Sequence, residues 1–210
     1  MSAVVATVET EAKARPTITP DDLLRLARDR RYELVDGQLV EKSMAATSSS
    51  VAVQIIYLLM KHCEETQAGL VLGADQGYQC FPHRPNTVRF PDVSFIARAR
   101  LTPDLVQGHI RIAPDLVVEV LSPGDLAHNV DQRIDDFLKA GVRLLWVVHP
   151  EARRVEVHRL GQRGEILRES DTLDGGDVLP GFRVPVRDLF RPLQLFPPTP
   201  ATTTSEALGS

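Results

Sequence analysis

The amino-acid sequence predicts an α/β or α+β fold in which a mixed central sheet is flanked by helices. Two runs, at 113–122 ("APDLVVEVLS") and 143–150 ("RLLWVVHP"), are apolar at successive positions, which is typical of strands that are covered on both faces. The stretch between them, 128–142, repeats apolar residues at the spacing of one helical face and stops at a glycine. Strand, helix and strand in this order indicate a sheet with helices packed against it.

The first third of the chain predicts a short helix, a hairpin and a longer helix. Thr19 precedes Pro20 and two acidic residues, a combination typical of a helix start. The dipeptide Asp36-Gly37 separates two β-prone segments and tolerates the positive φ angles of a type I′ turn. Residues 48–65 begin with serines, which suit helix caps, and then continue in an apolar run long enough for a buried helix.

The rest of the chain predicts further strands and a short last helix. The expected strands are 69–81 and 88–97 before the 113–122 strand, then an edge meander through 153–160 and 164–170, and the helix is 184–190. We expect one domain over residues 19–195. Residues 1–18 lack a sustained apolar period and residues 196–210 are rich in Pro, Ser and Thr, so both ends are expected to be disordered.

Composition excludes several classes of protein. With 210 residues, of which 43% are hydrophobic and 25% charged, the chain can bury one substantial core. The formal net charge of −4 excludes a strongly basic protein, so contact with nucleic acid would need a local patch or a bound metal ion. The start lacks the pattern of a signal peptide, and no apolar run approaches about 18 residues. We expect a cytoplasmic protein without a membrane segment.

Two carboxylates stand at the ends of predicted strands. Asp92 follows Pro91 at the start of one strand, and Glu119 lies near the end of the next, inside an apolar run. If the strands are neighbours, the two acids converge, and a cation between them would relieve their repulsion. Mg²⁺, with Mn²⁺ as a substitute, suits such a pair, and the backbone carbonyl of Val120 is a further candidate ligand. The alternative is that Asp92 caps a turn and Glu119 pairs with an arginine such as Arg133.

An ordered series of motifs carries a resemblance to a known family. "YELVDGQLVE", "FPDVSFI", "PDLVVEVLSP", a helix ending in "AGV" and the strand "LLWVVHP" resemble the Uma-type restriction endonucleases of the PD-(D/E)xK superfamily, over most of residues 20–191. The resemblance implies a restriction-endonuclease-like sheet flanked by helices, a divalent-metal site and hydrolysis of DNA. It also implies that Asp92 and Glu119 are the acidic pair and that Glu33, before the hairpin turn, is a third catalytic acid.

The sequence departs from the family pattern at its lysine. The superfamily usually has Lys two residues after the second acid, where this chain has Leu121, and Uma-type members usually have it on the following helix, where this chain has Arg133. Arg133 can bind the scissile phosphate but cannot act as a general base. The predicted function is an Mg²⁺-dependent DNA endonuclease with catalytic residues Asp92, Glu119, Arg133 and Glu33. The alternative is a weakly active or inactive nuclease-like module for nucleic-acid binding or assembly. Fold-level analogy favours a homodimer, which would supply two sites for the two strands of a duplex.

Overall fold

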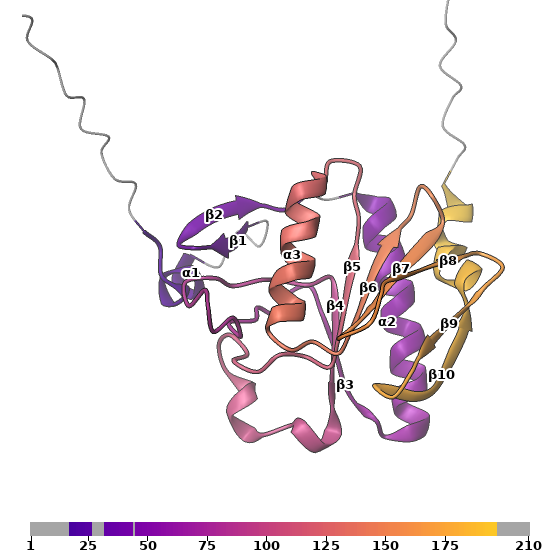
Figure 1. Ribbon diagram of the computed structural model, residues 1–210, viewed down its shortest axis with the longest axis horizontal. Coiled ribbons are helices and arrows are strands. Elements are labelled where there is room, and N and C mark those ends of the chain that lie inside the picture. The colour runs from indigo at the N-terminus through magenta and orange to yellow at the C-terminus, as the bar shows by residue number, and fades with distance from the viewer. Residues whose placement is uncertain (1–16, 27–31, 44, 197–210) are drawn as a thin grey trace, which may run out of the picture.

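The computed structural model describes residues 17–26, 32–43 and 45–196, and a six-stranded mixed sheet is its central layer (Figure 1). The spatial order of the strands is β3-β4-β5-β6-β7-β8. Only β5 and β6 run parallel within this sheet, and each of the other neighbouring pairs is antiparallel. The predicted fold class is therefore confirmed. The strands are β3 (Gly69–Gly73), β4 (Val93–Ala97), β5 (Leu116–Val120), β6 (Leu144–His149), β7 (Arg154–Arg159) and β8 (Glu165–Arg168).

Helices cover both faces of this sheet (Figure 1). One face packs against α2 (Ala46–Thr66), the 3₁₀ segment η3 (Val186–Leu195), and a separate hairpin of β9 (Thr172–Gly175) and β10 (Leu179–Pro185). The other face packs against α3 (Ala127–Lys139). Successive residues of β5 contribute to different cores, Val117 to the α3 side and Val118 to the α2 side. Burial on both faces explains the uninterrupted apolar run of this strand.

A small lobe formed by α1 (Pro20–Leu26), β1 (Tyr32–Val35) and β2 (Gln38–Glu41) lies beside this sheet (Figure 1). Asp36 and Gly37 have φ angles of 48° and 79°, as the predicted type I′ turn requires. Leu34 and Val88 exchange backbone hydrogen bonds of 2.8 and 3.0 Å. This pairing attaches the hairpin to the segment that leads into Asp92, so the residues after β2 come close to the start of β4.

Several predicted elements differ in their limits. Helix α2 begins at Ala46, and Ala45 is an N-cap without a side-chain hydrogen bond, so the serines lie inside the first turn and do not cap it. The strand predicted over 69–81 ends at Gly73, and Tyr78 makes only isolated bridges. The β9–β10 hairpin was not predicted, because its short strands contain glycines that resemble a loop. The segment predicted as a last helix is 3₁₀, with Pro192 inside it.

Three further predictions concern the start of α1, the two ends of the chain and membrane segments. The predicted cap of α1 is confirmed, since the Asp22 amide donates to Thr19 Oγ1 at 3.2 Å. The segments predicted to be disordered lie almost wholly outside the described residues. Within the described ranges, no helix is both long and apolar enough to cross a membrane.

Candidate active site

Asp92 and Glu119 lie at the same end of two neighbouring strands. Val93 pairs with Val118 in the antiparallel register of β4 and β5. Asp92, which precedes Val93, is therefore adjacent to Glu119, which follows Val118. The Val120 amide donates to Asp92 Oδ2 at 2.7 Å across this end of the sheet. The strand order thus brings together the two acids that the sequence singles out.

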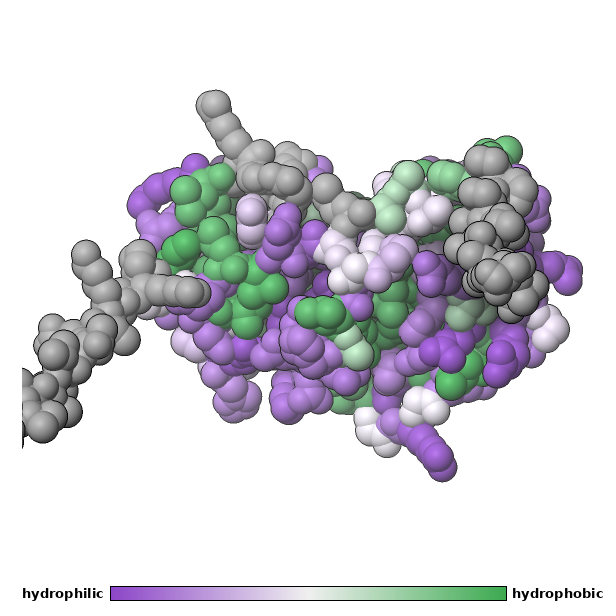
Figure 2. Space-filling model, turned by 90° about the horizontal axis from the view of Figure 1, so that it is seen from above, coloured by the Kyte–Doolittle hydropathy of each residue, from purple (hydrophilic) through white to green (hydrophobic). Residues whose placement is uncertain are grey.

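The acids line a pocket of about 170 Å³ between the start of α2, the turn after β5 and helix α3. Figure 2 views the molecule from this end, and its surface is hollowed near the middle, with weakly polar residues beside the hollow. Ser48 and Ser122 share a 2.7 Å hydrogen bond that joins α2 to the turn. A Cβ on Gly124 would lie 2.6 Å from Ser43 Oγ, so glycine allows this turn to approach the segment after the hairpin. The charged side chains among the lining residues are Lys42, Asp92, Glu119, Asp125 and Arg133.

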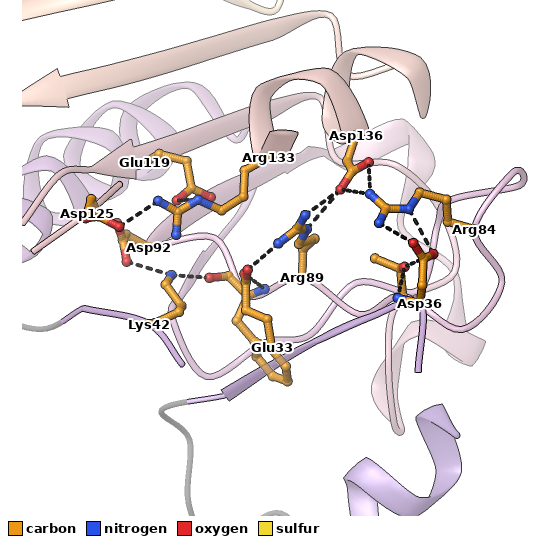
Figure 3. A network of polar contacts seen from close by, with 12 residues as sticks. Glu33, Asp36, Lys42, Arg84, Arg89, Asp92, Glu119, Asp125, Arg133 and Asp136 are labelled. Carbon is orange, nitrogen blue, oxygen red and sulfur yellow. Dashed lines mark hydrogen bonds and ion pairs between the residues drawn. The ribbon is translucent and has the colours of Figure 1, made fainter. Parts of the chain in front are cut away.

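Arg133 extends from α3 to two carboxylates (Figure 3). Its Nη2 donates to Asp125 Oδ1 at 2.9 Å, and its Nε lies 3.5 Å from Glu119 Oε2. Burial would lower the pKa of Arg133, but Glu119 and the other nearby carboxylates outweigh this effect and raise it. Arg133 is therefore a fixed positive charge in the pocket, and it makes the ion pair with Glu119 that the sequence left open as an alternative.

Lys42 reaches the pocket from the segment after β2. Its Nζ donates to Phe90 O at 2.6 Å and to Asp92 Oδ1 at 3.2 Å (Figure 3). Burial favours a lower pKa for Lys42, but the carboxylates of Asp92, Glu119 and Glu33 reverse this and raise it. The hairpin thus places a second cation beside the acidic pair.

The charge of Glu119 is only partly compensated in the pocket. Its side chain is 2% exposed, and burial raises its pKa to about 7, because Arg133 and Lys42 offset only part of the cost of ionisation. Glu119 Oε1 is buried and has no hydrogen-bond partner among the described residues. An ionised carboxylate with an unpaired buried oxygen is suited to accept a cation.

The donor set fits a hard divalent ion that keeps much of its water. Within the described ranges, no group of three or more His, Cys, Asp or Glu side chains is arranged for a metal. Asp92 and Glu119 would supply two oxygen ligands, and Mg²⁺ is commonly bound by one or two carboxylates together with water and substrate phosphate. The predicted ligand role of the Val120 carbonyl remains a prediction.

Glu33 belongs to a buried ion network next to this pocket (Figure 3). Its carboxylate accepts from Arg89 Nη1 at 2.6 Å and from the Phe90 amide at 3.0 Å. Burial opposes ionisation, but Arg89 and the neighbouring cations Lys42 and Arg133 lower the pKa of Glu33. Glu33 is absent from the lining of the pocket that holds Asp92 and Glu119, and it lines an adjacent polar pocket of about 140 Å³ that shares Arg133.

The network continues from Arg89 into helix α3 and to the hairpin turn. Arg89 donates to Asp136 Oδ2 at 2.6 Å, and Arg84 donates to both oxygens of Asp136 at 2.7 and 2.9 Å. The guanidinium of Arg84 also donates to Asp36 in the hairpin turn, at 2.5 and 2.9 Å. These contacts connect the hairpin lobe to the helix that carries Arg133.

Sequence reasoning did not find Lys42, Asp125 or the Arg89–Asp136 pair. Asp125 has a recognisable signal, since it closes the Ser-Pro-Gly-Asp turn and accepts from the Ser122 amide at 2.8 Å. Lys42 has no such signal, because a lysine at the end of an exposed hairpin strand is ordinarily solvated. Its position depends on how the hairpin docks.

The fold is shared with a protein of known structure. A crystal structure described as "a putative nuclease belonging to DUF820 from Anabaena variabilis" superposes with a TM-score of 0.70 at 22% identity, covering 82% of this chain and 97% of that chain. A family model described as "Uma2: Putative restriction endonuclease" matches residues 20–187, so the chain belongs to this family. The family inferred from the sequence is confirmed. A search of curated proteins gives no match.

Proposed function

We propose that the protein is an Mg²⁺-dependent endonuclease that hydrolyses DNA phosphodiester bonds at the Asp92–Glu119 pocket. The observation that carries this proposal is the unpaired, buried Oε1 of Glu119 beside Asp92, in a pocket that also holds two cations. Membership of a restriction endonuclease family supports nuclease activity. A metal-dependent reaction on a phosphodiester would use both the acids and the cations of this pocket.

The residues of the pocket have separable roles in this proposal. Asp92 and Glu119 would hold the divalent ion, which when bound polarises the phosphate and lowers the pKa of water. Arg133 stabilises the negative charge that develops on the phosphate oxygens, because its guanidinium offers five N–H donors and Asp125 accepts from only one of them. Asp125 fixes the orientation of that guanidinium.

The catalytic role of Glu33 is a separate part of the proposal. Its carboxylate faces Arg89 and lines the pocket that adjoins Arg133. From there Glu33 would orient water or a second ion approaching the phosphate from the Arg133 side. Glu33→Gln keeps the side chain's size, so loss of cleavage without loss of folding would support a catalytic role.

A second candidate function is favoured by the contacts of Arg133. Because Arg133 already pairs with Glu119 and Asp125, the same fold could bind nucleic acid or assemble with partners while cleaving weakly or not at all. Such a module would retain DNA binding in a gel-shift assay without nicking the DNA.

Incubation of the purified protein with supercoiled plasmid distinguishes the two functions. An endonuclease converts the plasmid to nicked or linear forms with Mg²⁺ or Mn²⁺, and Asp92→Asn and Glu119→Gln abolish this conversion. Asp135→Asn, an exposed acid on α3, is the matched control and should remain active. A folded protein that leaves plasmid and single-stranded DNA intact across both metals and neutral to alkaline pH would refute the enzyme proposal.

We further propose that the protein acts as a homodimer. Cleavage of both strands of a duplex requires two sites, and a symmetric dimer supplies them. Light scattering at micromolar concentration should give twice the mass of the 23.2 kDa chain, and a monomer would contradict the proposal.

A further inference from the structure

We propose that the ammonium group of Lys42 binds a nonbridging oxygen of the scissile phosphate, which makes Lys42 a catalytic residue supplied by the hairpin lobe. The inference rests on the proposed function, because it concerns the phosphodiester hydrolysed at the Asp92–Glu119 pocket. No motif of the sequence points to this lysine, and the structure alone places it there.

The hydrogen bonds of Lys42 leave it able to bind a ligand. Its side chain is only 13% exposed, yet it lines the pocket together with both acids. An ammonium group has three N–H donors, and within the described residues Phe90 O and Asp92 Oδ1 are the two acceptors that it contacts. The remaining N–H is available to an oxygen inside the pocket.

Contacts with the segment that leads into β4 hold the ammonium group of Lys42 beside Asp92. Phe90 accepts from Lys42 through its carbonyl and donates through its amide to Glu33 Oε1 at 3.0 Å. The adjoining hairpin is joined to the same segment by the backbone pairing of Leu34 with Val88. Lys42 is therefore held by two contacts with a segment that is itself fixed to the hairpin, and little further ordering is needed when a phosphate binds.

The charge balance of the pocket also favours a phosphate-binding role. Its lining contains three carboxylates and two cations, so with all of them ionised the pocket has one negative charge in excess. A bound divalent ion reverses this excess to one positive charge, which matches the single negative charge of a phosphodiester. Without Lys42 the loaded pocket would lack this complementary charge.

Lys42→Gln tests the inference, because Gln keeps N–H donors on a flexible side chain but has no charge. The first measurement is binding of a short fluorescein-labelled DNA duplex in Ca²⁺ at several salt concentrations. Loss of one phosphate contact reduces the slope of log K against log salt by about 0.9. The second is plasmid cleavage in Mg²⁺, which should fall roughly 10²–10³-fold, the usual effect of removing one transition-state donor. Mn²⁺ affinity should not decrease, since a competitor for Asp92 is removed.

Controls separate this role from a structural one. Lys61→Gln, at an exposed position on α2, should match the wild type in both assays, and Lys42→Arg should keep the wild-type salt slope. If Lys42→Gln does not fold, Lys42→Met, which retains the aliphatic stem, takes its place.

An unchanged salt slope and unchanged cleavage per folded molecule would overturn the inference. If the wild type itself does not cleave in any metal, the proposed function fails and this inference falls with it; equal cleavage by wild type and variant refutes this inference alone.

Discussion

Replacement of Glu119 by Gln should change how stability depends on pH. The pKa of the folded-state carboxyl is raised from 4.5 to about 7 by burial. A raised carboxyl pKa contributes stability below pH 4.5, and this contribution is lost as the pH rises through 7. The change of about two and a half pKa units corresponds to about 3 kcal/mol in the free energy of unfolding. Gln resembles the protonated carboxyl and cannot ionise, so its contribution does not vary with pH.

The assay is urea unfolding of metal-free wild type and Glu119→Gln between pH 5 and pH 8, with a chelator present. The difference in unfolding free energy, variant minus wild type, should increase by about 2–3 kcal/mol from pH 5 to pH 8, since part of the full change has already occurred at pH 5. Glu64→Gln, at an exposed position on α2, controls for the chemistry of the substitution and should follow the wild-type curve. A difference that stays constant across this range would refute the claim that Glu119 is buried with an undercompensated charge.

The remaining predictions concern three arginines. Arg133→Ala should destabilise the metal-free protein by about 3–5 kcal/mol, because it leaves buried carboxylates without their cation; added Mg²⁺ should recover part of this loss in thermal unfolding, whereas no recovery would count against a metal site there. Arg133→Lys keeps the charge and should retain cleavage well above the Ala variant, and a Lys variant as inactive as Ala would show that Arg133 is not the cation that contacts phosphate. Arg89→Ala should cost about 3–5 kcal/mol in urea unfolding, since Arg89 is 3% exposed between Glu33 and Asp136. Arg84→Ala should cost clearly less, because its partner Asp36 is 60% exposed and its buried partner Asp136 keeps the cation Arg89, and equal costs would contradict the buried-network account.

The sequence was sufficient for the parts of the fold that local patterns encode. The apolar runs of β5 and β6 and the amphipathic spacing of α3 follow directly from burial on one or both faces. The Asp36-Gly37 turn follows from backbone conformations that few other dipeptides adopt easily. Neighbouring strands then explain why Asp92 and Glu119 could be paired from sequence, since each acid lies at the strand end that the antiparallel register of β4 and β5 brings together.

The remaining parts of the site depend on tertiary contacts that no local pattern encodes. Lys42 enters the pocket because the hairpin docks on the segment before β4. Arg89 and Asp136 are far apart in the chain, and their 2.6 Å contact forms only when α3 packs beside this segment. The β9–β10 hairpin was overlooked because short glycine-containing strands resemble loops. The docking of the hairpin lobe and the buried ion network depend on tertiary packing, and the hydrophobic periodicity of the sequence does not predict such packing.

Calorimetric titration of the protein with Mn²⁺ tests the central claim, that Asp92 and Glu119 form a divalent-metal site, most directly. We expect wild type to bind Mn²⁺ at neutral pH, with affinity that falls as the pH drops below 7, because Glu119 must lose its proton to bind. Asp92→Asn and Glu119→Gln should each abolish this binding while Asp135→Asn, on the exposed side of α3, leaves it unchanged. Mn²⁺ affinity that is the same in wild type and in both site variants would contradict the account.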